Sequence, residues 1–136
     1  MPTNVELGAG VPSGPGGISL TTPLANTPDW TTNLSVSYEI GIWGGASLTP
    51  RVDWNYSDRI SGGAQDFALI RQSSYDVVNA NLTYLNGNGD WRIVAGVTNL
   101  TDELYFRAAG FSGAGGVATV AYARPREWYL QIKHDF

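Results

Sequence analysis

Cysteine is absent from this 136-residue sequence, and histidine occurs only once. Without cysteine the chain has no disulfide framework and no thiolate metal site. A single histidine has no second histidine with which to share a metal ion. The eight Lys and Arg residues are scattered singly, so no basic patch indicates nucleic-acid binding. We therefore expect no enzyme activity, no metal, no cofactor and no nucleic-acid partner.

Long apolar runs are also missing, because no stretch approaches the roughly 20 residues of a membrane-spanning helix. The first residues, M-P-T-N-V-E-L-G, have neither a basic region nor an apolar core, so they do not form a signal peptide. Taken as a complete protein, the chain is predicted to be cytoplasmic. Its strand pattern leads to a different expectation.

The last residues, Arg126 to Phe136, alternate in polarity. One set is mostly large and apolar, and it contains Trp128, Leu130, Ile132, His134 and Phe136. A period of two predicts a β-strand with two different faces. An aromatic residue at the very end suits a strand that finishes at a boundary between apolar surroundings and water. A strand of a soluble sandwich alternates in the same way, so this segment alone leaves both interpretations open.

The same alternation predicts five strands, over about residues 30–40, 46–56, 75–85, 91–99 and 117–136. Residues 1–29 are rich in Pro and Gly and are predicted to be an irregular loop or tail. Pro50 requires a position where its missing N–H does no harm, such as a bulge. The predicted fold class is all-β, an antiparallel meander of about five long strands. Their lengths match the about 9–11 residues that a tilted strand needs to cross a bilayer.

The connections alternate between short, at residues 41–45 and 86–90, and long, at 57–74 and 107–116. The short connection N-G-N-G-D is a hairpin signal, because Asn-Gly accepts positive φ angles. Short turns on one side and long loops on the other are typical of outer-membrane barrels.

Aromatic residues gather at both ends of the predicted strands, as expected where rings lie at two membrane interfaces. Those beside the short turns are Tyr38, Trp43, Tyr84 and Trp91. Those toward the long loops are Trp30, Trp54, Tyr56, Tyr105 and Phe106. A soluble antiparallel sandwich accounts for the alternation but not for two belts.

Four segments resemble the end of a TonB-dependent outer-membrane receptor. N-T-P-D-W-T at Asn26–Thr31 and L-T-P-R-V-D-W at Leu48–Trp54 resemble two late barrel strands of that family. V-T-N-L-T-D-E-L-Y at Val97–Tyr105 resembles the motif ahead of its last extracellular loop. A-R-P-R-E-W-Y-L-Q-I-K-H-D-F at Ala123–Phe136 resembles its closing strand. The order and spacing of all four agree with the family.

The resemblance implies a transmembrane barrel of about 22 strands, plugged by an N-terminal domain, in the Gram-negative outer membrane. It implies import of a scarce solute, such as an iron–siderophore complex, vitamin B12 or a glycan, with energy from an inner-membrane TonB complex. It also implies that the barrel-assembly machinery recognises the closing strand, through Trp128, Leu130, Ile132 and Phe136. His134 departs from that signal, because an aromatic residue is usual there.

Five strands are fewer than the eight with which the smallest membrane barrels close. They leave two open edges, whose backbone groups cannot face lipid unpaired. The sequence also lacks the family's signal peptide, TonB-binding box and plug. We therefore expect a fragment that is inactive alone, with lipid, the remaining barrel and the plug as partners. It would contact the TonB complex only through a missing N-terminal part.

The polar strand faces carry five charged side chains, which we expect to pair across strands on the lumen wall: Arg51, Asp53, Arg92, Lys133 and Asp135. Asp102 and Glu103 are adjacent, and neighbours in a strand point apart, so we assign them a loop role rather than acid–base chemistry. The long loops are the expected site of ligand contact, with Phe106, Arg107 and Phe111 as candidates.

Two alternatives remain at this point. One is a small soluble β-sandwich that binds carbohydrate through its tryptophans. The other is a small porin-like barrel that forms when several copies of the chain assemble. The sequence does not identify the transported solute.

Overall fold

The computed structural model describes residues 27–61, 70–112 and 116–136. The predicted tail at residues 1–29 lies almost entirely outside this part of the chain. The strands, with one short 3₁₀ turn, are β1 (Thr31–Ser37), β2 (Ile40–Gly41), η1 (Trp43–Gly45), β3 (Ser47–Ser57), β4 (Ile60–Ser61), β5 (Arg71–Gln72), β6 (Tyr75–Leu85), β7 (Trp91–Thr98), β8 (Phe106–Ser112), β9 (Val117–Tyr122) and β10 (Glu127–His134).

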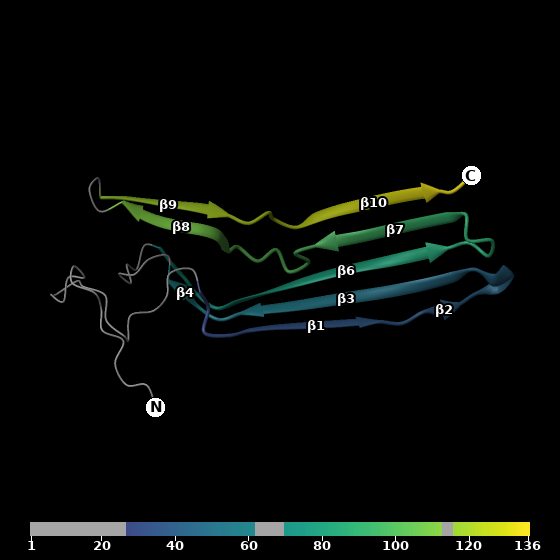
Figure 1. The fold of residues 1–136 in the computed structure, drawn as a ribbon, viewed down its shortest axis with the longest axis horizontal. Helices are drawn as coiled ribbons and strands as arrows, with labels where there is room; N and C mark the ends of the chain where they lie inside the picture. Colours follow the sequence, from purple (N-terminus) through teal and green to yellow (C-terminus); the bar gives the residue numbers. More distant parts are fainter. Residues whose placement is uncertain (1–26, 62–69, 113–115) are drawn as a thin grey trace, which may run out of the picture.

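The main sheet is an antiparallel meander in the order β1-β3-β6-β7-β10, with β2 also paired to β3. Two small sheets, β4-β5 and β8-β9, extend from the long-loop end. Figure 1 shows the two short turns and the C-terminus at the opposite end of the main sheet. No helix in the described ranges is long and apolar enough to cross a membrane. The prediction of an all-β fold built on five long antiparallel strands is confirmed.

The first predicted strand, over residues 30–40, is divided in the structure into β1 and β2. The division falls opposite Pro50, where Tyr38 N–H donates to the Pro50 carbonyl at 3.2 Å. Because proline has no N–H, it cannot return the second hydrogen bond of this pair. The ladder is therefore interrupted beside Pro50, and β1 and β3 pair without the bulge that we expected there.

The last predicted strand, over residues 117–136, is also two strands, because β9 pairs with β8 whereas β10 pairs with β7. Pro125 lies between them and cannot donate to a ladder. Residues 107–116, predicted as a long connection between strands, contain most of strand β8, which the prediction did not include. The connection at 57–74 likewise contains the short β4-β5 pair, while residues 62–69 lie outside the described part.

The register places polar and apolar side chains in separate rows that cross all five strands. An apolar row runs through Val36, Val52, Ala80, Val97 and Trp128. The neighbouring row on the opposite face runs through Ser37, Arg51, Asn81, Gly96 and Tyr129. Because side chains alternate along each strand, these rows make one continuous apolar face and one continuous polar face.

Neither face of the main sheet is covered by a second layer within the described residues. Only four apolar residues are buried there, namely Ala46, Ile70, Val77 and Val97. On the apolar face, Val36 is 62% exposed, Leu130 is 65% exposed and Ile132 is 61% exposed. Monomeric soluble proteins rarely expose so continuous an apolar surface. A soluble β-sandwich needs a second sheet on this face, and the described part of the chain has none.

The two short turns lie against each other. A Cβ atom added to Gly87 would overlap the Gly44 carbonyl group. In the second turn, Gly89 N–H donates to the Asn86 carbonyl at 3.0 Å, and Trp91 N–H donates to Asn86 Oδ1 at 2.9 Å. The positive φ angle of this turn is at Gly89, at 84°. The predicted hairpin is therefore present, and it is packed against its neighbour.

Gly96 is buried beneath the ring of Tyr129, its direct partner in β10. A Cβ atom at Gly96 would lie 2.7 Å from Tyr129 Cε1, closer than real Cβ contacts allow. Such ring-over-glycine pairs fix the register of neighbouring strands. We expect Gly96→Ala to lower the free energy of unfolding by about 1–3 kcal/mol, because the ring must move. Urea unfolding in detergent micelles measures this change.

Gly41→Ala is the matched control, because no atom lies within 4 Å of a Cβ added there. It should change the free energy of unfolding by no more than about 0.5 kcal/mol. Equal effects of the two substitutions would contradict the role assigned to the Tyr129 contact.

Candidate functional site

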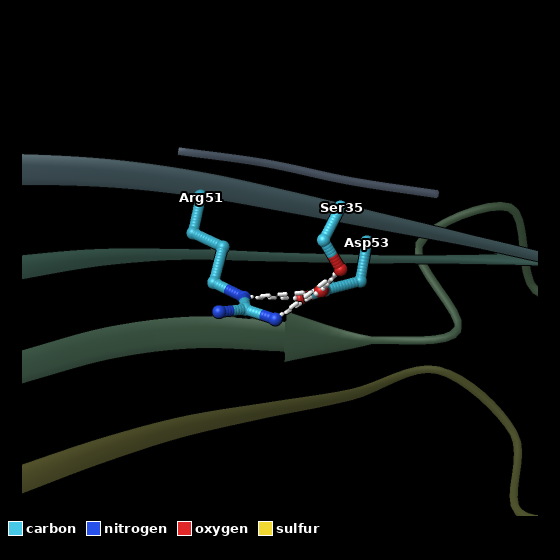
Figure 2. A network of polar contacts seen from close by, with 3 residues as sticks. All are labelled: Ser35, Arg51 and Asp53. Atoms are coloured by element: carbon cyan, nitrogen blue, oxygen red, sulfur yellow. Dashed lines mark hydrogen bonds and ion pairs between the residues drawn. The ribbon is translucent and has the colours of Figure 1, made fainter. Parts of the chain in front are cut away.

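The polar face is the first candidate surface, and it carries a hydrogen-bonded cluster of Ser35, Arg51 and Asp53 (Figure 2). Arg51 Nη2 lies 2.6 Å from Asp53 Oδ1, and Arg51 Nε lies 2.9 Å from Asp53 Oδ2. Ser35 lies on β1, directly opposite Asp53 of β3. Its hydroxyl donates a hydrogen bond to Asp53 and accepts one from Arg51 Nη2 at 3.2 Å. A two-pronged guanidinium–carboxylate contact holds both side chains in one orientation.

The charged pairs on this face differ from the expected cross-strand arrangement. Arg51 pairs with Asp53, and Lys133 with Asp135 at 3.0 Å, each within one strand or its extension. Side chains two residues apart point to the same face, so such pairs form without a neighbouring strand. Ser35 connects β1 to the Arg51–Asp53 pair.

Two hollows lie on the polar face. One, of about 550 Å³, is in the short-turn half. Its described lining contains Arg51, Arg92 and Lys133 together with neutral polar side chains and two apolar ones, Val94 and Ile132. The other, of about 720 Å³, is toward the long loops, and Asn55 and Asn79 are among its lining residues. Both hollows are open, and most of the described residues that line them carry polar or charged side chains. Such walls suit water, solutes or polar protein surfaces more than an apolar ligand.

Tyr105 lies on the polar side, although its position in the sequence predicted a membrane belt. Its ring stacks on Tyr75, with centroids 4.4 Å apart, and both rings line the larger hollow. Tyr75 pairs with Ser57 and so belongs to the polar rows. The expectation overlooked that Tyr105 follows the turn after β7, where strand alternation no longer determines side-chain direction.

The remaining belt candidates lie at the two ends of the apolar face or in the turns beside it. At the long-loop end, Tyr56 contacts both Trp30, at 6.3 Å between ring centroids, and Trp54, at 6.2 Å. At the short-turn end, Trp43 is 90% exposed and Tyr38 is 72% exposed. Tyr84 pairs with Ile93 in the apolar rows, and Trp91 pairs with His134.

The alternate residues of β10 lie in the apolar rows of the sheet. Trp128 pairs with Val97, Leu130 with Ala95, and Ile132 with Ile93. His134 takes the place of the expected aromatic residue, because its ring lies 4.3 Å from that of Trp91 and 4.5 Å from that of Phe136. An imidazole ring can therefore occupy the aromatic position of this strand.

The loop candidates belong to the β8–β9 hairpin. The Phe106 ring meets Tyr122 edge to face at 5.1 Å, and its N–H donates to Gln72 Oε1 at 2.7 Å. Arg107 is exposed and lines the larger hollow. Phe111 pairs with Ala118 through the backbone, and its side chain lies outside the described part of the structure.

Asn99 is the residue whose role the sequence pattern did not reveal. It is 3% exposed and has a positive φ angle of 51°. Its side chain accepts from Glu103 N–H at 2.8 Å and donates to the carbonyls of Glu103 at 2.9 Å and Arg124 at 3.3 Å. Asn99 therefore closes the turn after β7 and joins it to the chain that leads into β10.

Asp102 makes a second connection of the same kind, which we group with Asn99 as the β7–β10 latch. Asp102 also has a positive φ angle, 57°, and its Oδ1 accepts from Arg126 N–H at 2.8 Å. Arg126 in turn donates to the Leu100 carbonyl at 3.3 Å. The loop role predicted for Asp102 is thus a structural one. The signal was N-L-T-D itself, because Asn and Asp tolerate positive φ best.

We expect Asn99→Ala to lower the free energy of unfolding by about 2–4 kcal/mol, because it leaves buried backbone groups unpaired at a positive φ angle. Urea unfolding measures the loss. Glycine tolerates the positive φ angle, so Asn99→Gly should lower the free energy of unfolding by less. The loss that remains measures the contribution of the side-chain hydrogen bonds. The exposed Asn88→Ala should have almost no effect. Wild-type stability in Asn99→Ala would contradict the latch.

Comparison with known proteins agrees with this geometry. A family model described as TonB dependent receptor-like, beta-barrel, matches residues 8–100, more than half of the chain. The fold is also similar to the crystal structure of the ferric yersiniabactin uptake receptor FyuA from Yersinia pestis, with a TM-score of 0.70 and 22% identity. That match covers 80% of this chain and 16% of the receptor chain.

A search of curated proteins finds no match. The family match extends over the segment that contains β1 to β7. The chain belongs to the TonB-dependent receptor β-barrel family.

Proposed function

We propose that this chain is a wall segment of an outer-membrane receptor that imports a scarce solute, and that it is not active alone. The observation that carries the proposal is the pair of uninterrupted faces across five strands, one apolar and one polar, with no second layer on either within the described residues. In the proposed receptor the apolar face contacts lipid and the polar face lines the lumen.

The two ends of the sheet support an orientation. Transmembrane barrels have short turns on the periplasmic side and longer loops outside the cell. The turns at 41–45 and 86–90 would then be periplasmic, and the β4–β5 and β8–β9 hairpins extracellular. The proposed aromatic belts lie at these two levels, with Tyr38, Trp43, Tyr84 and Trp91 at one and Trp30, Trp54 and Tyr56 at the other.

Open strand edges support the part of the proposal that concerns partners. Both β1 and β10 have one edge without a partner strand among the described residues. Lipid cannot satisfy these backbone groups, so other strands must pair with them. We propose closure within a barrel of about 22 strands. The plug and the TonB complex would act through the rest of the receptor, and the barrel-assembly machinery through Trp128, Leu130, Ile132 and Phe136.

The proposed solute class is an iron–siderophore complex, vitamin B12 or a glycan. The ferric yersiniabactin receptor, whose fold is similar, directs the first test to ferric siderophores. The larger hollow and the β8–β9 hairpin, with Phe106, Arg107 and Phe111, are the proposed contacts. The soluble carbohydrate-binding sandwich is less favoured, because its second sheet is missing from the described part.

Leu82 and Thr83 are neighbours on β6 that test which face meets lipid. Leu82 lies on the apolar face and is 44% exposed, whereas Thr83 lines the smaller hollow on the polar face. In a bilayer we expect Leu82→Arg to lower the free energy of unfolding by about 2–4 kcal/mol. Thr83→Arg is the control and should cost much less. Urea unfolding in lipid vesicles measures both, and equal tolerance would contradict a lipid-facing surface.

The size and location of the native product test the receptor assignment. An antibody against the Arg126–Phe136 peptide should detect, in outer-membrane fractions of the source organism, a band far larger than 14.6 kDa. The reason is that the open edges require additional strands. A single band near 14.6 kDa in the soluble fraction would overturn the assignment.

A further inference from the structure

Arg92 and Lys133 face each other directly across β7 and β10, and both line the smaller hollow. From this arrangement we propose that the hollow binds a carboxylate carried by an acidic polypeptide segment. The inference rests on the proposed function, because it takes the polar face to line an enclosed lumen in which a polypeptide segment can lie against the hollow. It adds a specific contact to that function.

The charges around the hollow are unbalanced. Among the described residues, its lining side chains include three cations, Arg51, Arg92 and Lys133, and no carboxylate. Arg51 forms an ion pair with Asp53, and Lys133 forms one with Asp135. Arg92 has no ion pair with any of the described residues. One guanidinium group is therefore available in a hollow of one charge sign.

Direct opposition of two like charges destabilises an antiparallel sheet. The other residue pairs between β7 and β10 do not oppose two like charges; examples are Val94 with Gln131 and Gly96 with Tyr129. A carboxylate placed between Arg92 and Lys133 would convert the repulsion into two favourable contacts. A guanidinium group suits this role, because it can bind both carboxylate oxygens at once.

The shape of the hollow favours a polypeptide over a small solute. Its lining extends across all five strands, from Ser37 on β1 to Lys133 on β10, a width of roughly 19 Å at the usual strand spacing. Small-molecule sites are mostly enclosed, whereas this wall is open. Besides its cations and two apolar residues, Val94 and Ile132, its described lining consists of Ser, Thr, Asn and Gln side chains. These groups can hydrogen-bond a backbone along its length. The lining residues Thr83, Arg92 and Lys133 lie near the short-turn ends of β6, β7 and β10, away from the long-loop hairpins.

Zero-length crosslinking of the native product in its membrane tests the contact. A carbodiimide joins a lysine amine to a carboxylate in direct contact, with loss of water, and mass spectrometry identifies the joined peptides. In the Arg92→Lys variant we expect residue 92 to be joined to an Asp or Glu outside residues 27–136. The control is Arg59→Lys, an exposed cation outside this hollow, which should give no such product.

The thermal midpoint of the native product gives a second readout. Arg92→Gln should lower the midpoint by several degrees at low salt, and the loss should shrink at high salt because exposed charges are screened. Without an acidic partner the same substitution only relieves repulsion, so a raised or unchanged midpoint would overturn the proposal. Arg59→Gln is the control for loss of one exposed positive charge.

The outcomes separate this inference from the proposed receptor function. A large outer-membrane product whose residue 92 joins only Asp90 or Asp135, or nothing, would overturn the acidic-segment contact and leave the receptor assignment intact. If no crosslinked peptide forms and a soluble anion shields residue 92 from chemical modification, the hollow would be assigned to a small solute. That outcome would also overturn the acidic-segment contact. A small soluble product would overturn the receptor assignment by itself.

Discussion

The register of the backbone ladder is the constraint on which the rest of this structure depends. A shift of one residue between two strands would turn every side chain of one strand to the opposite face. The apolar row from Val36 to Trp128 and the polar row from Ser37 to Tyr129 exist only because four successive strand pairings keep the same register. The described residues form no packed core, so the register is maintained mainly by backbone hydrogen bonds and by side-chain contacts between neighbouring strands.

Specific contacts hold the register where the sheet is vulnerable. Tyr129 covers Gly96 on the polar face, and the β7–β10 latch joins the two strands beside the point where Pro125 breaks the ladder. The two short turns pack against each other at the other end. The family's sequence motifs around Asn99 and Arg126 therefore describe the two halves of one structural connection. This structural connection accounts for the motifs without any contact to a ligand.

Much of the fold could be predicted from the residues alone. Period-two alternation identified the long strands of the meander, because most positions on one side of each strand are apolar. Polar residues on that side, such as Thr32, Asp76 and His134, lie toward the strand ends. The strand expected over residues 75–85 coincides with β6. The predictions failed where backbone chemistry interrupts the pattern. Pro50, which lies in β3, interrupts the hydrogen bonds to the neighbouring strand and so divides that strand into β1 and β2. Strand β8 lies in a Gly-rich segment, and its pairing with β9 does not appear in the sequence as alternation.

The sequence by itself determined the polarity of each face, the positions of the tight turns and the aromatic residues at the strand ends, because these are local properties of consecutive residues. Only the tertiary structure decided which residues meet across strands. It paired Arg51 with Asp53 within one strand, stacked Tyr105 on Tyr75, joined Asn99 to Arg124 and set Arg92 opposite Lys133. The physical reason is that these contacts depend on strand register and on chain direction after a turn. Both are set by hydrogen bonds between segments that lie far apart in the chain.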